Sequence, residues 1–302
     1  MKVLFTGATG VLGRAAVPLL VDQGHEVSAL ARAEEDRSRL EGIGARPVAV
    51  DLFDPEQVET AVKDVETVIH FATAIPALDS MPKREAWVTN DRLRSEATRL
   101  LVDSALANGL DRFIQQSITF IYADGGDEWI DESAPIAPAR EILDSALDAE
   151  HHVQRFRDGG GTGVTLRLSR LYGPGAASAE LIAGVRAHTV PIVGDGSNFV
   201  SSLHVEDAAA ALVAALNVAD GTYNVSDDEP VTSAVDMDTL AELLGARRPR
   251  RVPAPIVDRP GPPTISHRVT NTRFRQVTGW APRFPSVRRG WAEVVDRLAG
   301  DG

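Results

Sequence analysis

The fold is decided by residues 1–14, which read MKVLFTGATGVLGR. Residues 3–5 form an apolar run of strand type, glycines follow at positions 7, 10 and 13, and residues 15–20 begin a helical pattern. Strand, glycine-rich turn and helix in this order predict a cradle for a pyrophosphate. Gly7 and Gly10 would let backbone amides approach the phosphates, Gly13 would let the helix lie close to the strand, and the helix N-terminus would face the negative charge.

Such a glycine triplet also closes ordinary strand-helix junctions, so its context has to support the functional reading. Two further strand-like runs, at Glu26 to Ala31 and Arg46 to Val50, follow at intervals of about one helix. This alternation is typical of an α/β fold with a doubly wound parallel sheet of Rossmann type, and it favours dinucleotide binding. Further strands are expected at residues 65–71, 112–121 and 164–168, and helices at 87–108, 140–156 and 205–215.

After residue 168 the regular alternation loosens into loops and proline-rich stretches. We therefore expect a dinucleotide-binding Rossmann domain over residues 1–168, to which 200–226 return. Residues 169–199 and 227–302 would form a smaller C-terminal substrate lobe.

Composition narrows the function classes. The chain has 302 residues, a formal net charge of −12 and no cysteine. The negative charge argues against a nucleic acid or an anionic membrane as partner, and the missing cysteines exclude disulfides, thiolate metal sites and a cysteine nucleophile. No signal peptide or spanning helix is evident, so the sequence reads as a cytoplasmic protein. We expect no metal site, and His70 is read as a structural histidine.

The arginines after the second expected strand bear on cofactor choice. Arg32 stands where an NAD-preferring site would usually carry an acid, and Arg14 or Arg37 would support it. A guanidinium there would pair with a 2′-phosphate, so NADP(H) is favoured over NAD(H). The alternative is that these arginines are solvated surface charges.

Two more segments are expected to border the cofactor. Asp51 and Leu52 would lie near the adenine, and the small residues Ala72 and Ala74 follow the fourth strand where bulky side chains would collide with the dinucleotide. The complete predicted cofactor set is Gly7, Thr9, Gly10, Val11, Leu12, Gly13, Arg14, Arg32, Asp51, Leu52, Ala72 and Ala74.

The order of several fragments resembles the extended short-chain dehydrogenase/reductase family, also called the NAD-dependent epimerase/dehydratase family. The fragments span nearly the whole chain: residues 6–13, Asp51-Leu52, residues 69–72, Asn90, Arg167, residues 172–174, residues 204–208 and residues 221–225. The resemblance implies a Rossmann core, a small-molecule site between core and lobe, and often a homodimer.

The family's usual chemistry uses a Ser or Thr at the end of the fifth strand and a Tyr-x-x-x-Lys pair on the next helix. Aligned on that pattern, Ile118, Ile142 and Ala146 stand at the Ser/Thr, Tyr and Lys positions. None of these side chains can transfer a proton. The resemblance therefore implies the fold but not the usual acid/base set.

Substitutes for the missing groups have to come from nearby residues. Tyr122 follows the fifth strand, where it would either relay a proton or only pack and form a hydrogen bond with the substrate. Ser117 and Thr119 flank Ile118 and are further candidates for relaying a proton. Arg170 is a candidate cation for Tyr122 or for a substrate carboxylate or phosphate. Asp131 and Glu132 are read as loop acids.

Two functions stay open on the sequence. The first is an NAD(P)-dependent oxidoreductase of the epimerase/dehydratase type that acts on a small polar or anionic metabolite with a non-standard acid/base set. The second is an NADP(H)-binding protein without redox turnover, such as a sensor, a partner-binding module or a non-redox isomerase or cyclase.

Overall fold

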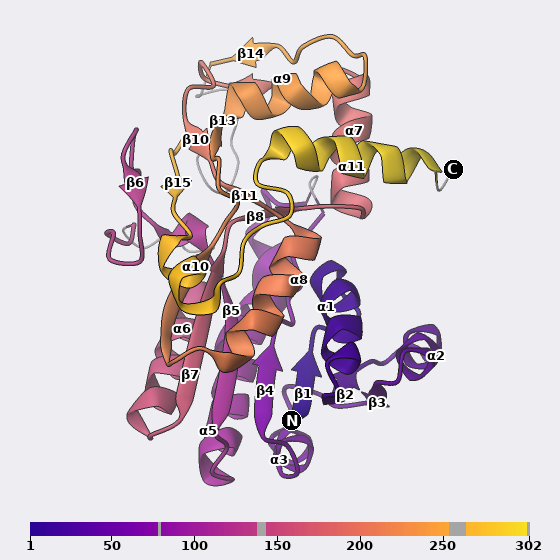
Figure 1. The fold of residues 1–302 in the computed structure, drawn as a ribbon, viewed down its shortest axis with the longest axis vertical. Coiled ribbons are helices and arrows are strands. Elements are labelled where there is room, and N and C mark those ends of the chain that lie inside the picture. The colour runs from indigo at the N-terminus through magenta and orange to yellow at the C-terminus, as the bar shows by residue number, and fades with distance from the viewer. Residues whose placement is uncertain (78–79, 138–142, 254–263, 301–302) are drawn as a thin grey trace.

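A computed structural model describes residues 1–77, 80–137, 143–253 and 264–300 of the chain. Its centre is a seven-stranded parallel sheet in the order β12-β7-β5-β4-β1-β2-β3 (Figure 1). The strands are β1 (Lys2–Thr6), β2 (Glu26–Leu30), β3 (Arg46–Val48), β4 (Thr67–His70), β5 (Arg112–Ile118), β7 (Thr162–Leu168) and β12 (Gly221–Val225). The predicted Rossmann-type sheet is confirmed.

Helices cover both faces of this sheet, which explains why its central strands are apolar on both sides. In β1, Val3 and Phe5 pack into the core beneath α1 (Val11–Asp22) and α8 (Val205–Ala214), while Leu4 packs into the core beneath α3 (Pro55–Val62) and α5 (Thr98–Ala107). The helices are α1 (Val11–Asp22), α2 (Glu34–Gly42), α3 (Pro55–Val62), α4 (Val88–Arg92), α5 (Thr98–Ala107), α6 (Asp144–Asp158) and α8 (Val205–Ala214).

A smaller lobe lies beyond the carboxyl ends of the strands, at the top of Figure 1. Its helices are α7 (Ala176–Arg186), α9 (Ser233–Leu243) and α11 (Val287–Gly300), whereas α10 (Thr272–Thr278) packs on the sheet through Phe274, whose ring contacts Tyr223 of β12. Its short strands, with one from the first half of the chain, are β6 (Trp129–Ile130), β8 (Arg170–Tyr172), β9 (Ile192–Val193), β10 (Phe199–Val200), β11 (Ser202–His204), β13 (Val231–Thr232), β14 (Arg251–Val252) and β15 (Arg268–Val269). Trp291, Tyr172 and Leu240 belong to its apolar core.

Two expected elements differ from the prediction near the carboxyl edge of the sheet. The fifth strand ends at Ile118, and a 3-10 turn at Thr119–Ile121 follows it. The expected helix over 87–108 is interrupted by a π-helical segment at Leu93–Ala97, preceded by a 3-10 turn at Arg84–Trp87. Hydrophobic spacing cannot reveal such an extra residue, because the apolar face continues on either side of it.

The π segment is anchored from the sheet. His70, the last residue of β4, contacts the carbonyl oxygen of Leu93 through Nε2 at 3.0 Å and the hydroxyl of Thr6 through Nδ1 at 2.6 Å. Since a carbonyl only accepts, Nε2 carries the proton. Burial lowers the pKa of His70 to about 4 and keeps the ring neutral, so the structural reading of His70 is confirmed.

Among the described residues, no helix is both long enough and apolar enough to cross a bilayer.

Candidate active site

The glycine-rich loop between β1 and α1 fits a dinucleotide pyrophosphate. A Cβ at Gly7, whose φ is +82°, would lie 2.5 Å from the carbonyl carbon of Phe71, and one at Gly13 would lie 2.2 Å from the carbonyl oxygen of Gly7. Only glycine therefore allows this close approach of loop, helix and strand. Gly10 is the N-cap of α1, no side chain caps this helix, and no acid lies in its first turn. Its amides thus remain available to an anion.

Other residues of the predicted cofactor set lie around this loop. Val11 is 53% exposed at the first turn of α1, whereas Leu12 is buried in the core. A Cβ on Gly175, in the loop before α7, would be 3.5 Å from the side chain of Val11. The loop that enters the lobe therefore passes next to the glycine-rich loop.

The arginines near α1 and β2 differ in how far their charge is already neutralised. Arg14 donates to the carbonyl oxygen of Thr9 at 2.9 Å and pairs with Asp36 at 3.3 Å. Arg37 lies 3.7 Å from Glu34. Arg32 is exposed, and within the described ranges it has no ion pair or hydrogen bond. Of the three, Arg32 is the one whose charge remains free for a ligand.

The two other predicted cofactor segments border the same edge of the sheet. Asp51 is exposed and accepts from the amide of Phe53 at 3.0 Å, and Leu52 packs into the core. Ala72 and Ala74 are partly buried, and the amide of Ala74 donates to Oδ1 of Asn90 at 3.2 Å. These residues stay predicted cofactor contacts.

The interpretation of Tyr122 as a proton relay has to be corrected. Its side chain is completely buried, its hydroxyl donates to Oδ1 of Asn224 at 2.8 Å, and Nη1 of Arg167 donates to the same hydroxyl at 2.8 Å. Burial raises the pKa of Tyr122, which further weakens it as a base. Tyr122 is therefore part of the structural core between β5, β7 and β12.

Ser117 belongs to the same closed network and is corrected as well. It is fully buried, and its hydroxyl donates to Glu150 of α6. Glu150 also holds Arg167 in a bidentate pair, with distances of 2.9 and 2.7 Å. Burial alone would lower the pKa of Arg167, but the hydrogen bonds and charge of Glu150 raise it above its ordinary value. We refer to Ser117, Tyr122, Glu150, Arg167 and Asn224 as the closed network.

Thr119 is the remaining hydroxyl candidate. It is 1% exposed in the 3-10 turn, and its hydroxyl lies 3.5 Å from that of Ser169. Its role in catalysis stays a prediction.

Arg170 is not an open cation for a substrate. Its Nη2 pairs with Asp236 at 2.7 Å and donates to the hydroxyl of Ser202 at 2.8 Å. Asp227, whose pKa is raised by burial, lies close enough to attract it as well. Because Asp236 already neutralises it, the sequence-based role of Arg170 as an anion holder is corrected.

On the family's sequence pattern, the tyrosine and lysine positions are assigned to residues 142 and 146, at the start of α6. Ile142 lies outside the described residues, whereas Ala146 is completely buried. The preceding Ser145 donates to Oδ1 of Asp91 on α4 at 2.8 Å, which joins the two helices. The lysine position therefore contributes an apolar contact and no charge.

One buried charge close to this junction was missed by the sequence analysis. Arg94 lies in the π segment and is 3% exposed. Its only sequence signal would have been a charged residue on the buried face of an amphipathic helix, one turn after Asn90.

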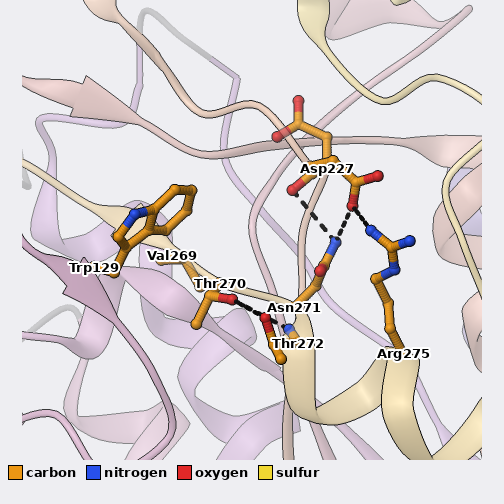
Figure 2. A pocket seen from close by; sticks show the side chains of 8 residues that line it. Trp129, Asp227, Val269, Thr270, Asn271, Thr272 and Arg275 are labelled. Carbon is orange, nitrogen blue, oxygen red and sulfur yellow. Dashed lines mark hydrogen bonds and ion pairs between the residues drawn. The ribbon is translucent and has the colours of Figure 1, made fainter.

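Outside this edge, a cavity of about 370 Å³ opens beside β15 and α10 (Figure 2). In its lining, Asp228 accepts from Asn271 at 2.9 Å and from Arg275 at 2.8 Å, whereas neither carboxylate oxygen of Asp227 has a hydrogen-bond partner among the described residues. None of the sequence-predicted site residues lines it. Across the described ranges, no group of three or more His, Cys, Asp or Glu is placed to hold a metal ion.

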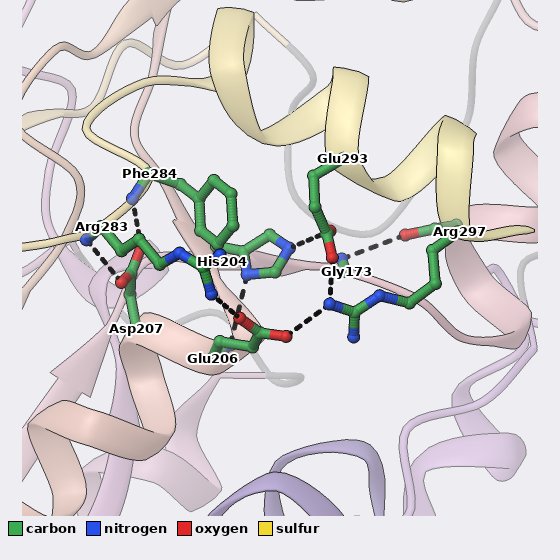
Figure 3. Close-up of polar contacts among 9 residues, drawn as sticks. Gly173, His204, Glu206, Asp207, Arg283, Phe284, Glu293 and Arg297 are labelled. Atoms are coloured by element: carbon green, nitrogen blue, oxygen red, sulfur yellow. Dashed lines mark hydrogen bonds and ion pairs between the residues drawn. The ribbon is translucent and has the colours of Figure 1, made fainter.

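A second polar cluster joins α11 to the start of α8 (Figure 3). His204 contacts Glu293 at 3.1 Å, Glu206 accepts from Arg297 at 2.7 Å, and Asp207 accepts from the backbone amides of residues 283 and 284 at 2.7 and 2.9 Å. These groups satisfy one another and fix the lobe on the sheet domain.

Comparison with known proteins agrees with this architecture. A Thermotoga maritima UDP-glucose 4-epimerase with UDP-glucose is 20% identical, with a TM-score of 0.82, over 100% of this chain and 99% of its own. A Thermus thermophilus UDP-glucose 4-epimerase complex with NAD is 24% identical, with a TM-score of 0.80, over 100% of both chains. At these identities the likeness shows the fold alone.

Sequence relatives are more specific. A 3-diazoavenalumate denitrifying reductase from a Streptomyces species is 37% identical over 305 residues, covering 96% of this chain and 99% of that protein. A 2-alkyl-3-oxoalkanoate reductase from Stenotrophomonas maltophilia (strain K279a) is 28% identical over 271 residues, covering 82% and 77%. The model of the NAD dependent epimerase/dehydratase family matches residues 3–226. The chain therefore belongs to the NAD dependent epimerase/dehydratase family and is of the NAD(P)-dependent oxidoreductase type.

Proposed function

We propose that this protein is an NADPH-dependent reductase that delivers hydride to an electrophile whose reduction needs no proton from a side chain. The observation that carries the proposal is the apolar, buried Ala146 at the lysine position, together with Tyr122 sealed in the closed network. This supports a site in which neither the lysine position nor the nearest substitute for the tyrosine moves a proton.

The cofactor would be held by the residues already described. The amides at the start of α1 would bind the pyrophosphate, Gly7 and Gly13 would keep the loop close to the strand, and Arg32 would pair with the 2′-phosphate. When bound, a reduced nicotinamide supplies a hydride; replacement of a diazonium group by that hydride gives a C–H bond, dinitrogen and the oxidised nicotinamide, and consumes no proton.

The relatives separate two chemistries. Reduction of a ketone creates an alkoxide, which has to be protonated and therefore profits from a Tyr-Lys pair. Release of dinitrogen creates no such anion. The name of the 37% identical Streptomyces protein specifies a denitrifying reductase of a diazo compound, whereas the 28% identical protein is named for an oxoalkanoate; both names denote carboxylates. The residues of this chain favour the diazo class.

Competing substrates test this choice. The purified protein is given NADPH with 4-carboxybenzenediazonium or with a panel of 3-oxoalkanoates, and NADPH absorbance and benzoate formation are followed. We expect benzoate and oxidised cofactor in equal amounts from the diazonium compound, unchanged turnover in Tyr122→Phe, and little reduction of the ketones. Preferential ketone reduction, or NADPH binding without any consumption, would contradict the proposal; the second result would favour the non-redox alternative.

The cofactor preference has a separate test. NADPH should bind at least about tenfold more tightly than NADH, because a guanidinium-phosphate pair adds about 1.5–3 kcal/mol. Calorimetric titration of Arg32→Ala should show this gap narrowing, while Arg37→Ala, the neighbouring arginine beside Glu34, should leave it nearly unchanged. Equal affinities of the unmodified protein for the two cofactors would refute the 2′-phosphate role.

A further inference from the structure

Arg94 carries a buried guanidinium for which the described residues supply no partner. It is 3% exposed, and within the part of the chain that the structure describes no hydrogen bond or ion pair reaches it. The carboxylate of Asp91 attracts it through space, but Asp91 is itself paired with Arg84 at 2.6 Å and accepts from Ser145. Arg94 thus adds a positive charge that its surroundings do not neutralise.

A second unpartnered donor lies one helical turn before it. Asn90 is completely buried, its Oδ1 accepts from the amide of Ala74, and among the described residues its Nδ2 has no partner. Asn90 and Arg94 are four residues apart, which is about one turn of an α- or a π-helix, so the two residues lie on the same side of this helical stretch. Two buried donors on one face require an acceptor that the described residues do not supply.

The position of this pair places it at the reacting edge of the sheet. Asn90 is bonded to the segment that follows β4, and the carbonyl of Leu93, directly before Arg94, is held by His70 at the end of that strand. On the other side, Asp91 is bonded to Ser145, the neighbour of Ala146. The pair therefore lies between the cofactor-bordering loop and the apolar lysine position.

The local backbone supports a functional reading. Leu93–Ala97 is π-helical, and single π segments inside α-helices are frequent at functional sites, where the extra residue re-aims neighbouring side chains. Burial lowers the pKa of Arg94 to about 10, which still leaves it charged at neutral pH. Water would satisfy the amide of Asn90, whereas neutralising the buried charge of Arg94 needs an anion.

We propose that Arg94 and Asn90 form the binding site for a carboxylate of the substrate. The inference rests on the proposed function for its location in a reductase site, and it deepens that function by naming the substrate class. A carboxylate offers two acceptor oxygens in the geometry that a guanidinium matches. The carboxylate-bearing substrates of the proposed function present this group. Arg94 takes the anion-binding role that the sequence had suggested for Arg170.

Binding of matched acids and amides tests the site without turnover. The protein saturated with NADP is titrated calorimetrically with benzoate and benzamide, and with cinnamate and cinnamamide. We expect the acids to bind about 10- to 100-fold more tightly than the amides, as a charge-assisted bidentate pair requires. In Arg94→Gln this preference should disappear, and in Arg94→Lys part of it should remain.

Arg92→Gln is the matched control, because Arg92 is exposed two residues away and paired with Glu96 at 2.8 Å. It should keep the full preference for acids. NADP affinity should be unchanged in Arg94→Gln; an equal loss of NADP and acid binding would show that Arg94 holds the cofactor and would overturn the proposal. So would an unmodified protein that binds acid and amide equally.

Thermal unfolding and the diazonium assay add two further measurements. Should Arg94→Gln fold poorly, heating the unmodified protein with each ligand replaces it: cinnamate should raise the unfolding temperature and cinnamamide should not. The acid preference also separates this proposal from the reductase proposal. An acid preference with no diazonium reduction refutes only the reaction, whereas diazonium reduction without an acid preference refutes only the carboxylate site.

Discussion

Two buried arginines of this molecule are handled in opposite ways. Arg167 on β7 is held by both carboxylate oxygens of Glu150 and by the hydroxyl of Tyr122, so its charge and donors are matched inside the protein. Arg94, equally buried, has no matched partner among the described residues. The difference indicates which buried charge serves the fold and which one awaits a ligand.

The contrast also explains the failed candidates for catalysis. Ser117 and Tyr122 lie beside the expected reacting edge in sequence, but both are consumed by the closed network that joins β5, α6, β7 and β12. A completed network gains rigidity and loses the ability to exchange protons with a substrate. The donors of Asn90 and Arg94, in contrast, have no partner among the described residues and stay available to a ligand.

Breaking the closed network should have the largest effect. Glu150→Ala would leave Arg167 buried without its counter-charge, and we expect a loss of about 3–5 kcal/mol in the free energy of unfolding. Urea denaturation followed by circular dichroism measures this value. The double variant Glu150→Leu, Arg167→Met removes both charges and should recover most of the loss. A single variant that loses less than about 1 kcal/mol would show that the network is not a structural unit.

The fold was largely predictable because its signals are local. The glycine spacing at residues 7, 10 and 13 and the alternation of apolar runs determine strand, turn and helix directly, and the sheet has the predicted Rossmann type. The end of β5 at Ile118 and the π segment were not predictable. Both depend on bonds between distant residues, such as His70 with the carbonyl of Leu93.

The cofactor side of the site rests on local signals in the sequence, and its residues stay predicted contacts, whereas the catalytic side does not follow from local signals. Backbone geometry at Gly7 and Gly13 follows from the residue type, whereas the role of Tyr122, Ser117 or Arg170 depends on which side chains meet it in space. Asn224, which accepts from the hydroxyl of Tyr122, lies 102 residues further along the chain, and no periodicity reveals that it helps to enclose the ring. The burial of Arg94 likewise depends on tertiary packing, which the sequence pattern does not reveal.

Acid sharpens the comparison, because His70, which holds the carbonyl of Leu93 next to Arg94 in the chain, resists protonation in the folded protein. The pKa of His70 is lowered from 6.5 to about 4 by burial, so between these values the unfolded chain binds a proton that the folded chain does not. Stability should therefore fall as the pH drops from 6.5 to 4, by about 3 kcal/mol, and this contribution should stay constant above 6.5.

Urea unfolding of the unmodified protein and of His70→Asn across this pH range isolates the effect. Other groups titrate in both proteins, so the difference between the two curves reports His70. We expect the unmodified protein to lose about 3 kcal/mol more than the variant. Parallel curves would mean that His70 accepts a proton in place, and that the π segment tolerates a second charge.

The smallest expected effect is the one that separates the two arginines most sharply. Arg94→Met removes a buried charge that has no matched partner among the described residues, so the free energy of unfolding should stay the same or rise by up to about 1 kcal/mol in the absence of ligand. Arg167→Met, measured alongside in urea, should lose about 3–5 kcal/mol because it strands Glu150. Arg92→Met, at the exposed pair with Glu96, should change stability by no more than about 0.5 kcal/mol. If Arg94→Met destabilised the protein as strongly as Arg167→Met, the charge of Arg94 would be neutralised by the protein itself. The guanidinium would then not be available to bind a substrate carboxylate.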